Sequence, residues 1–132
     1  MCEILLRAYD KGRKEYLTYG NLFIAISKGE RPNKNEVYLD VINNPDKYKD
    51  RFIIEQYAGL TDKNGKRVFD GDIVKNEYET GKYQYFKIFY CDRTYCWCVE
   101  NKYGMVGNLY NVIGNVEVVG NIHHNSYLLE NQ

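Results

Sequence analysis

The side chains of this 132-residue chain that could ligate a soft metal are four cysteines and two histidines. Structural zinc sites usually use two pairs of ligands, each pair separated by about two to four residues. Cys96 and Cys98 have one residue between them and no matching second pair. On a strand the two thiols share a face and lie too far apart for an easy disulfide. We therefore interpret Cys2, Cys91, Cys96 and Cys98 as free thiols, and keep as the alternative a metal bound by Cys96, Cys98 and His123 or His124.

Two acidic clusters could bind a divalent ion or transfer protons. Asp70 and Asp72 flank a glycine and could act as paired carboxylates. The run from Asp62 to Gly65 is similar to a calcium loop, but it lacks a third oxygen ligand before its glycine, and Ile73 stands where the loop needs Glu. Turn formation explains both clusters, so we predict no metal site.

No nucleophilic or nucleotide-binding motif is present. The only serines, Ser27 and Ser126, do not lie in a nucleophile-elbow pattern, and the chain has neither a phosphate-binding glycine loop nor a dinucleotide fingerprint. We therefore predict no catalytic residue and no cofactor, and that the protein is not an enzyme.

Tyrosine is unusually frequent, with 14 Tyr against 5 Phe. Its ring can cover a thin β core while the hydroxyl reaches water, or it can form a recognition surface, because tyrosine is enriched at interfaces and can stack on bases. Lysines and tyrosines alternate after residue 74, and we predict a binding surface there. Its residues are Lys75, Lys82, Tyr83, Tyr85, Lys87, Tyr95 and Tyr103.

Charge argues against a nucleic-acid partner. Lys plus Arg and Asp plus Glu are equal at 18 each, so no overall field attracts an anionic polymer. Glu77 and Glu79 also lie in the hairpin that carries the lysines.

No apolar run approaches the roughly 18 residues that a membrane span needs, and no signal peptide is recognisable, so we expect a protein of the cytosol.

A glycine-rich stretch must position these residues. Phe52–Tyr57 is aromatic and β-branched, which predicts a strand that ends at Gly59. Asp62–Gly65 predicts a turn in which the Asp carboxylate binds backbone N–H groups. After an extended piece, Asp70–Asp72 predicts a second corner, and the chain then enters the core at Ile73 and Val74.

The rest of the chain predicts mainly short strands separated by Gly and Asn turns. The expected strands are Glu3–Tyr9, Glu15–Tyr19, Leu22–Ile26, Val37–Ile42, Asp72–Glu79, Tyr83–Cys91, Tyr95–Glu100 and Asn115–Ile122. In the strand Tyr83–Cys91, the set Gln84, Phe86, Ile88 and Tyr90 is expected to face the core. The other expected segments are a polar loop over Ser27–Asn35, a short helix over Pro45–Arg51 capped by Asn44, an irregular crossing over Met105–Val112, and a helical turn capped by Asn125 in the tail His123–Leu129.

This spacing predicts a mostly β fold, either a small barrel or a sandwich. Of these we expect a small SH3-like or partly open β-barrel with an N-terminal hairpin extension and one or two short helices. We expect one domain over 1–132. Its parts are a hairpin, loop and helix over 1–50, a barrel core over 51–123 and a tail over 124–132.

Three blocks of sequence resemble the YopX family, small proteins encoded mainly by bacteriophages and prophages. The run YAGLTDKNGKRVFDGDIV at Tyr57–Val74 resembles the family signature, in the residues Tyr57, Gly59, Leu60, Asp62, Asn64, Gly65, Gly71, Asp72, Ile73 and Val74. EILLRAYD at Glu3–Asp10 is similar to its first strand, with Tyr9 in place of Trp. VEVVGNIHHNSYLLE at Val116–Glu130 is similar to its last strand and helical turn, without the usual proline.

The resemblance implies a mostly β fold with a small barrel, in a phage or prophage protein of a bacterial cell, and it offers no catalytic residue. Our leading hypothesis is a non-catalytic module that binds a protein partner. The alternatives are a single-stranded nucleic-acid binder and a structural homo-oligomer.

Overall fold

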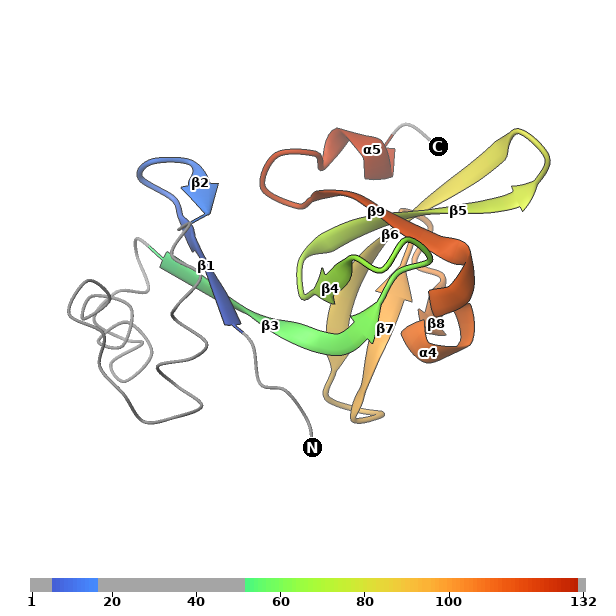
Figure 1. The fold of residues 1–132 in the computed structure, drawn as a ribbon, viewed down its shortest axis with the longest axis horizontal. Coiled ribbons are helices and arrows are strands. Elements are labelled where there is room, and N and C mark those ends of the chain that lie inside the picture. Colours follow the sequence, from blue (N-terminus) through green and yellow to red (C-terminus); the bar gives the residue numbers. More distant parts are fainter. Residues whose placement is uncertain (1–5, 17–51, 131–132) are drawn as a thin grey trace. The chain divides into compact units, whose positions relative to one another are not determined.

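The structure is a computed structural model that describes residues 6–16 and 52–130. Its contacts divide the chain into two compact units, Met1–Gln56 and Tyr57–Gln132, which we describe separately (Figure 1). The described residues are mostly β, with a curled half-barrel sheet and short helices, as predicted. The likeness to SH3 barrels and the single domain stay predictions. The segments expected at Leu22–Ile26, Ser27–Asn35, Val37–Ile42 and Pro45–Arg51 lie outside the described residues.

The first unit contains the predicted N-terminal hairpin. Strand β1 (Leu6–Asp10) pairs antiparallel with β2 (Glu15–Tyr16) and with the first half of β3 (Phe52–Thr61). The buried Asp10 shapes the turn, because its Oδ1 accepts hydrogen bonds from the N–H groups of Gly12 (2.9 Å) and Arg13 (3.2 Å). A short acidic side chain that binds the backbone two and three residues ahead is a common way to fix such a turn.

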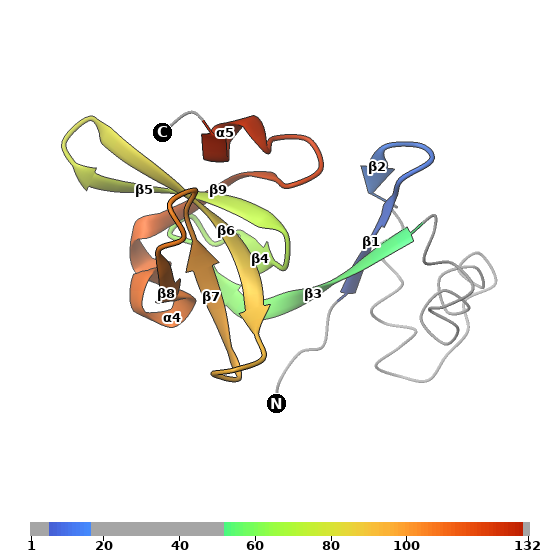
Figure 2. The same cartoon turned by 180° about the vertical axis from the view of Figure 1, so that it is seen from behind.

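The second unit is built on an antiparallel sheet of five strands, in the order β8-β7-β6-β5-β9 (Figure 2). These strands are β5 (Asp72–Glu79), β6 (Lys82–Cys91), β7 (Cys96–Glu100), β8 (Val106–Asn108) and β9 (Val116–Asn121). The second half of β3 pairs with β4 (Arg67–Phe69). The short helices are α4 (Leu109–Val112), the 3-10 helix η1 (Ile113–Asn115) and α5 (Tyr127–Glu130).

Strand register gives this sheet an inner and an outer face. Residues that are directly opposite in neighbouring strands point to the same side, and successive residues alternate. The pairing of Val74 with Phe86 and with Val118 therefore identifies the inner face. The buried core lies on this face and consists of Val68, Val74, Ile88, Val99, Leu109, Val116 and Val118. Phe86 packs against it, so the face predicted for β6 is confirmed at Phe86 and Ile88.

The outer face is partly covered by the end of the chain. Ile73 points outward with Lys87 as its partner in β6 and Gly120 as its partner in β9, yet it is fully buried. Asn125 lies against Gly120, and its Oδ1 accepts a hydrogen bond from Asn121 N–H (3.1 Å). Helix α5 then contacts β6. The tail thus covers the part of the outer face around Gly120.

Gly71 is the corner at which β4 turns into β5. Its φ of +85° lies in the region that favours glycine. Its N–H donates to the carbonyl of Ile88 (3.0 Å), and its carbonyl accepts from Ile122 N–H (2.8 Å). The predicted corner is therefore confirmed, and one residue joins the β4–β5 turn both to β6 and to the segment after β9.

Several local predictions are wrong. Strand β3 does not end at Gly59 but continues to Thr61, because a register shift between Tyr57 and Thr61 accommodates Gly59 at a φ of +82°. Tyr95 belongs to the turn before β7, with a φ of +54°, and Tyr90 is exposed although its alternation set faces the core.

Two further predictions, an irregular crossing and a helix cap, also need correction. The irregular crossing expected at Met105–Val112 contains strand β8 and helix α4, whose N-cap is Asn108 through a 2.9 Å bond from Tyr110 N–H. The predicted helical turn in the tail exists at Tyr127–Glu130. The side-chain oxygen of Asn125, expected to cap that turn, binds back to Asn121 in the preceding strand.

We predict that Gly71→Val destabilises the protein by about 1 to 3 kcal/mol, since a β-branched residue is strained at this φ. Chemical denaturation of the two proteins measures the difference. Gly114→Val is the matched control, because Gly114 lies in η1 with open space around its added Cβ, and it should change the free energy of unfolding by less than about 0.5 kcal/mol. Equal loss in both variants would show that the corner conformation does not matter.

Gly120→Ala should destabilise the fold through a direct clash with the tail. An added Cβ would lie 2.7 Å from Asn125 Cβ and closer still to Asn125 Oδ1. Overpacking of this kind costs about 1 to 3 kcal/mol. In a double-mutant cycle, Asn125→Gly should reduce the cost of Gly120→Ala by at least about 1 kcal/mol. Additive effects would mean that the tail does not pack on Gly120.

Candidate functional site

The structure brings together four residues of the predicted binding surface. Lys75 is directly opposite Tyr85 across β5 and β6, and Lys87 follows on the same outer face of β6. Tyr83 also points to this face, and the Lys75 ammonium lies 4.5 Å from the centre of its ring. The alternation of lysine and tyrosine in the sequence therefore becomes a contiguous surface. Lys82 is the first residue of β6 and adjoins Tyr83 in the chain, and we include it in what we call the β5–β6 surface.

Carboxylates neighbour the cations of this surface. Lys75 Nζ lies 3.9 Å from Glu117 Oε2, and Lys82 Nζ lies 3.0 Å from Glu79 Oε2. Lys87 is directly opposite Glu100 in β7. Strong binding to a phosphate backbone needs several cations whose charge is available to it. Here each lysine has an acidic neighbour, so the β5–β6 surface is nearly neutral.

Tyr95 and Tyr103 do not join the β5–β6 surface. Tyr95 lies in the turn before β7 and Tyr103 in the turn after it, so the two rings stand at opposite ends of that strand. Both are strongly exposed, at 81% and 69% of the residue surface. The predicted surface is therefore one contiguous group and two separate tyrosines.

Sequence reasoning missed the apolar residues next to Tyr103. Met105, Val106 and Tyr110 follow it within the β7–β8 turn, β8 and the start of α4, and all three are exposed. We call the four residues the β8 surface. The turn beneath them is ordered by Asn101, whose Oδ1 accepts hydrogen bonds from the N–H groups of Tyr103 (3.0 Å) and Met105 (3.1 Å). In the sequence, the apolar and Gly residues of Met105–Val112 predicted only an irregular crossing. Nothing in their pattern indicated that Met105, Val106 and Tyr110 are exposed.

Asp62, the first acidic residue of the family signature, accepts hydrogen bonds from backbone N–H groups. Asp62 Oδ1 accepts hydrogen bonds from the N–H groups of Asn64 (2.9 Å) and Lys66 (2.8 Å), and its Oδ2 accepts one from Val118 N–H in β9 (2.8 Å). The first bond is the one that the turn pattern predicts. Burial alone would raise the pKa of Asp62, but these three N–H groups and the nearby Lys66 ammonium outweigh it and lower the pKa.

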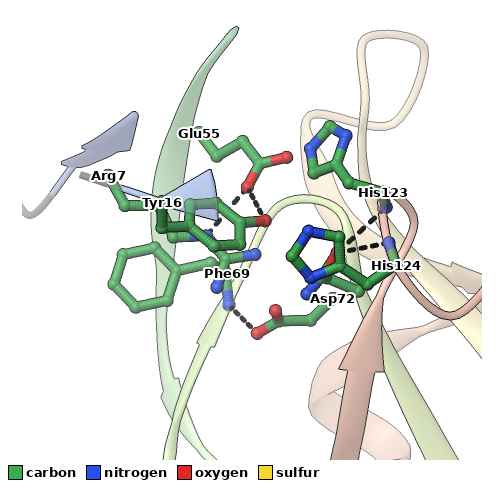
Figure 3. Close-up of polar contacts among 8 residues, drawn as sticks. Arg7, Tyr16, Glu55, Phe69, Asp72, His123 and His124 are labelled. Carbon is green, nitrogen blue, oxygen red and sulfur yellow. Dashed lines mark hydrogen bonds and ion pairs between the residues drawn. The ribbon is translucent and has the colours of Figure 1, made fainter. Parts of the chain in front are cut away.

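Asp72 of the second acidic cluster and the two histidines also take part in turns that involve the backbone. Asp72 is buried, and its Oδ2 accepts a hydrogen bond from Phe69 N–H (2.8 Å) (Figure 3). The N–H groups of His123 and His124 both donate to Asn121 Oδ1. Within residues 6–16 and 52–130, no three His, Cys, Asp or Glu side chains are grouped to hold a metal ion.

A buried carboxylate with an arginine and a tyrosine as partners was not predicted in the first unit. Glu55 is buried in β3, and its Oε1 accepts hydrogen bonds from Arg7 Nε (2.8 Å) and from the Tyr16 hydroxyl (2.7 Å) (Figure 3). The Arg7 guanidinium also lies 4.3 Å from the centre of the Tyr16 ring. Because Arg7 and Glu55 are opposite each other across β1 and β3, the ion pair joins the two strands. Sequence analysis missed this ion pair because its two residues are 48 positions apart.

None of the helices in the described part of the chain is long and apolar enough to cross a membrane.

We predict that Asp62→Asn destabilises the protein by about 1 to 3 kcal/mol at pH 7, because a neutral amide replaces a carboxylate that accepts three N–H groups. The pKa of Asp62 is lower in the folded chain than the ordinary pKa of an aspartate, so the carboxylate stabilises the fold above that ordinary pKa. The contribution is lost as the pH falls through the folded pKa.

Urea denaturation at a series of pH values checks this prediction. The difference between the wild type and Asp62→Asn should therefore shrink below about pH 4. Asp92→Asn, in an exposed turn, is the control and should leave the stability unchanged. A difference that stays constant down to pH 2 would contradict the role of the charge.

Comparison with known proteins supports the fold and gives the family. A crystal structure of protein EF1440 from Enterococcus faecalis is similar to this chain, with a TM-score of 0.56 at 20% identity, over 96% of this chain and 97% of that chain. No curated protein sequence is similar enough to count as a match. The model of the YopX protein family matches residues 5–130, nearly the whole length. The chain therefore belongs to the YopX protein family.

Proposed function

We propose that this YopX family member is a phage or prophage accessory protein that acts without catalysis, as a module that binds a protein partner in the cytoplasm of the bacterial host. The observation that carries the proposal is the exposed β8 surface, Tyr103, Met105, Val106 and Tyr110. Family membership supports the phage setting.

The composition of the β8 surface suits a protein interface. Tyrosine and methionine are enriched in the central part of protein–protein interfaces, and tyrosine is frequent among residues whose truncation costs most affinity. Tyr110 is 72% exposed and Met105 is 63% exposed, so both could lose a large apolar area to a partner.

The backbone beneath this surface is already ordered. Asn101 is buried and holds the turn through two backbone N–H groups, and Asn108 caps α4. A surface that is fixed before binding loses less conformational entropy when a partner docks. Strand β8 also ends the sheet order, which places these side chains at an edge of the sheet.

A protein partner fits the charges better than single-stranded nucleic acid does. The lysines of the β5–β6 surface have carboxylate neighbours, notably Glu117 beside Lys75 and Glu79 beside Lys82. A nucleic-acid site would need those cations for phosphates. A homo-oligomer that buries its tyrosines between subunits is the other alternative.

Affinity capture from infected host cells tests the proposal, with the tagged full chain as bait. We expect the double change Tyr103→Ala and Tyr110→Ala to weaken binding of the captured protein at least tenfold, since rings at interface centres often contribute more than about 1 kcal/mol each. Titration calorimetry with the purified partner measures the affinity.

Tyr78→Ala is the matched control, because Tyr78 is exposed but lies in β5, away from the β8 surface. It should bind like the wild type. Equal binding by the double variant, or no captured protein that differs from an untagged control, would contradict the proposal. Retardation of single-stranded DNA at about 50 mM salt would support the nucleic-acid alternative instead. Light scattering that shows an oligomer at micromolar concentration would support the homo-oligomer alternative.

A further inference from the structure

We propose that Cys91 and Cys96 form a reversible thiol–disulfide exchange site at the end of the β6–β7 hairpin, which accepts a low-molecular-weight disulfide as its oxidant. This inference is independent of the proposed partner binding. It rests on the relative positions of three thiols on the outer face of the sheet.

Strand register places Cys91 and Cys96 directly opposite each other. They are the last residue of β6 and the first of β7, and they close the turn Asp92–Tyr95. The Cα atoms of directly opposite residues in antiparallel strands are about 4.5 to 5.5 Å apart, which is within the range of disulfides. Both side chains point to the same face, and both residues are half-buried and so accessible to a small reagent.

Cys98 lies next to this pair but is a poorer disulfide partner. Its Sγ is 3.6 Å from Cys96 Sγ, which is a hydrogen-bonding contact between the two thiols. Two residues apart on one strand, however, their Cα atoms are roughly 6.6 Å apart and their side chains are parallel, at the limit of what a disulfide spans. Cys98 is also buried, at 4% exposure. Register and access therefore favour Cys91 with Cys96.

The turn supplies donors that favour a thiolate at Cys91. Hydrogen bonds from the Thr94 side chain and from the backbone of Thr94 and Arg93 lower the pKa of Cys91. Thr94 Oγ1 also lies 3.0 Å from Cys96 Sγ. Burial, together with the contact to Cys96, raises the pKa of Cys98 to about 11. Cys91 is therefore a better nucleophile than Cys98.

The exchange has two steps. The Cys91 thiolate attacks one sulfur of the small disulfide, forms a mixed disulfide and releases one small thiolate. Cys96 then loses its proton to solvent and attacks Cys91 Sγ, which forms the Cys91–Cys96 bond and releases the second small thiolate. The two protein thiols are oxidised, the small disulfide is reduced to two thiols, and a reducing thiol reverses both steps.

Glutathione redox buffers test the site in the full chain. Under oxidising buffer we expect a mass decrease of about 2 Da, and peptide mapping should locate the bond at Cys91–Cys96. Reduced glutathione should reverse the change. Cys91→Ser and Cys96→Ser should abolish it, whereas Cys98→Ser and Cys2→Ser should retain it.

A second measurement needs no variant. Iodoacetamide should alkylate Cys91 before Cys98 in the native chain. The equilibrium constant for oxidation by glutathione should also be at least tenfold higher in the folded chain than in urea, because the hairpin holds Cys91 and Cys96 together. A bond at any other pair, mixed disulfides that never resolve, or equal constants in the folded and unfolded chain would overturn the proposal.

Discussion

The half-barrel of the second unit depends on one buried carboxylate. Strand β9 ends the order of the five-stranded sheet, and an edge that is left without partners exposes N–H and carbonyl groups. Asp62 and the residue after it cover this edge. Asp62 Oδ2 accepts Val118 N–H, and Lys63 N–H donates to the Val116 carbonyl (3.1 Å). Since Asp62 Oδ1 holds its own turn at the same time, a single side chain shapes the β3–β4 turn and attaches it to β9.

The alternation of side chains along β5 and β6 then separates the residues that fill the core from those on the outer face. Val74 and Phe86 point inward, toward the core that Val68 and Leu109 complete. Tyr85, across the ladder from Lys75, points outward. An antiparallel sheet that buries one face leaves the other face to be covered by other segments or exposed to solvent. Here the tail covers the part around Gly120, and the remainder carries lysines, tyrosines and the three thiols.

Much of this arrangement could be predicted from local sequence, because the relevant physics is local. Gly71 and the Asp62–Gly65 turn were recognisable, since positive φ and side-chain-to-backbone bonds depend on adjacent residues. The bond between Asp62 and Val118 was not, because it joins residues 56 positions apart. The burial of Glu55 was not predicted either, because it depends on the pairing with β1 that places Arg7 opposite it. Tyr95 at positive φ was also missed, since nothing in its type favours that conformation.

The family signature and the candidate sites occupy different parts of the chain. Signature residues such as Asp62, Gly71 and Val74 hold turns or fill the core, so replacing them changes the fold before it changes any surface. The β8 surface and the cysteine pair lie instead at the two ends of β7, outside the signature. A turn or strand end can change its side chains while the ladder behind it keeps the same hydrogen bonds. A partner or redox function placed there can therefore differ from one family member to another without any change in the half-barrel.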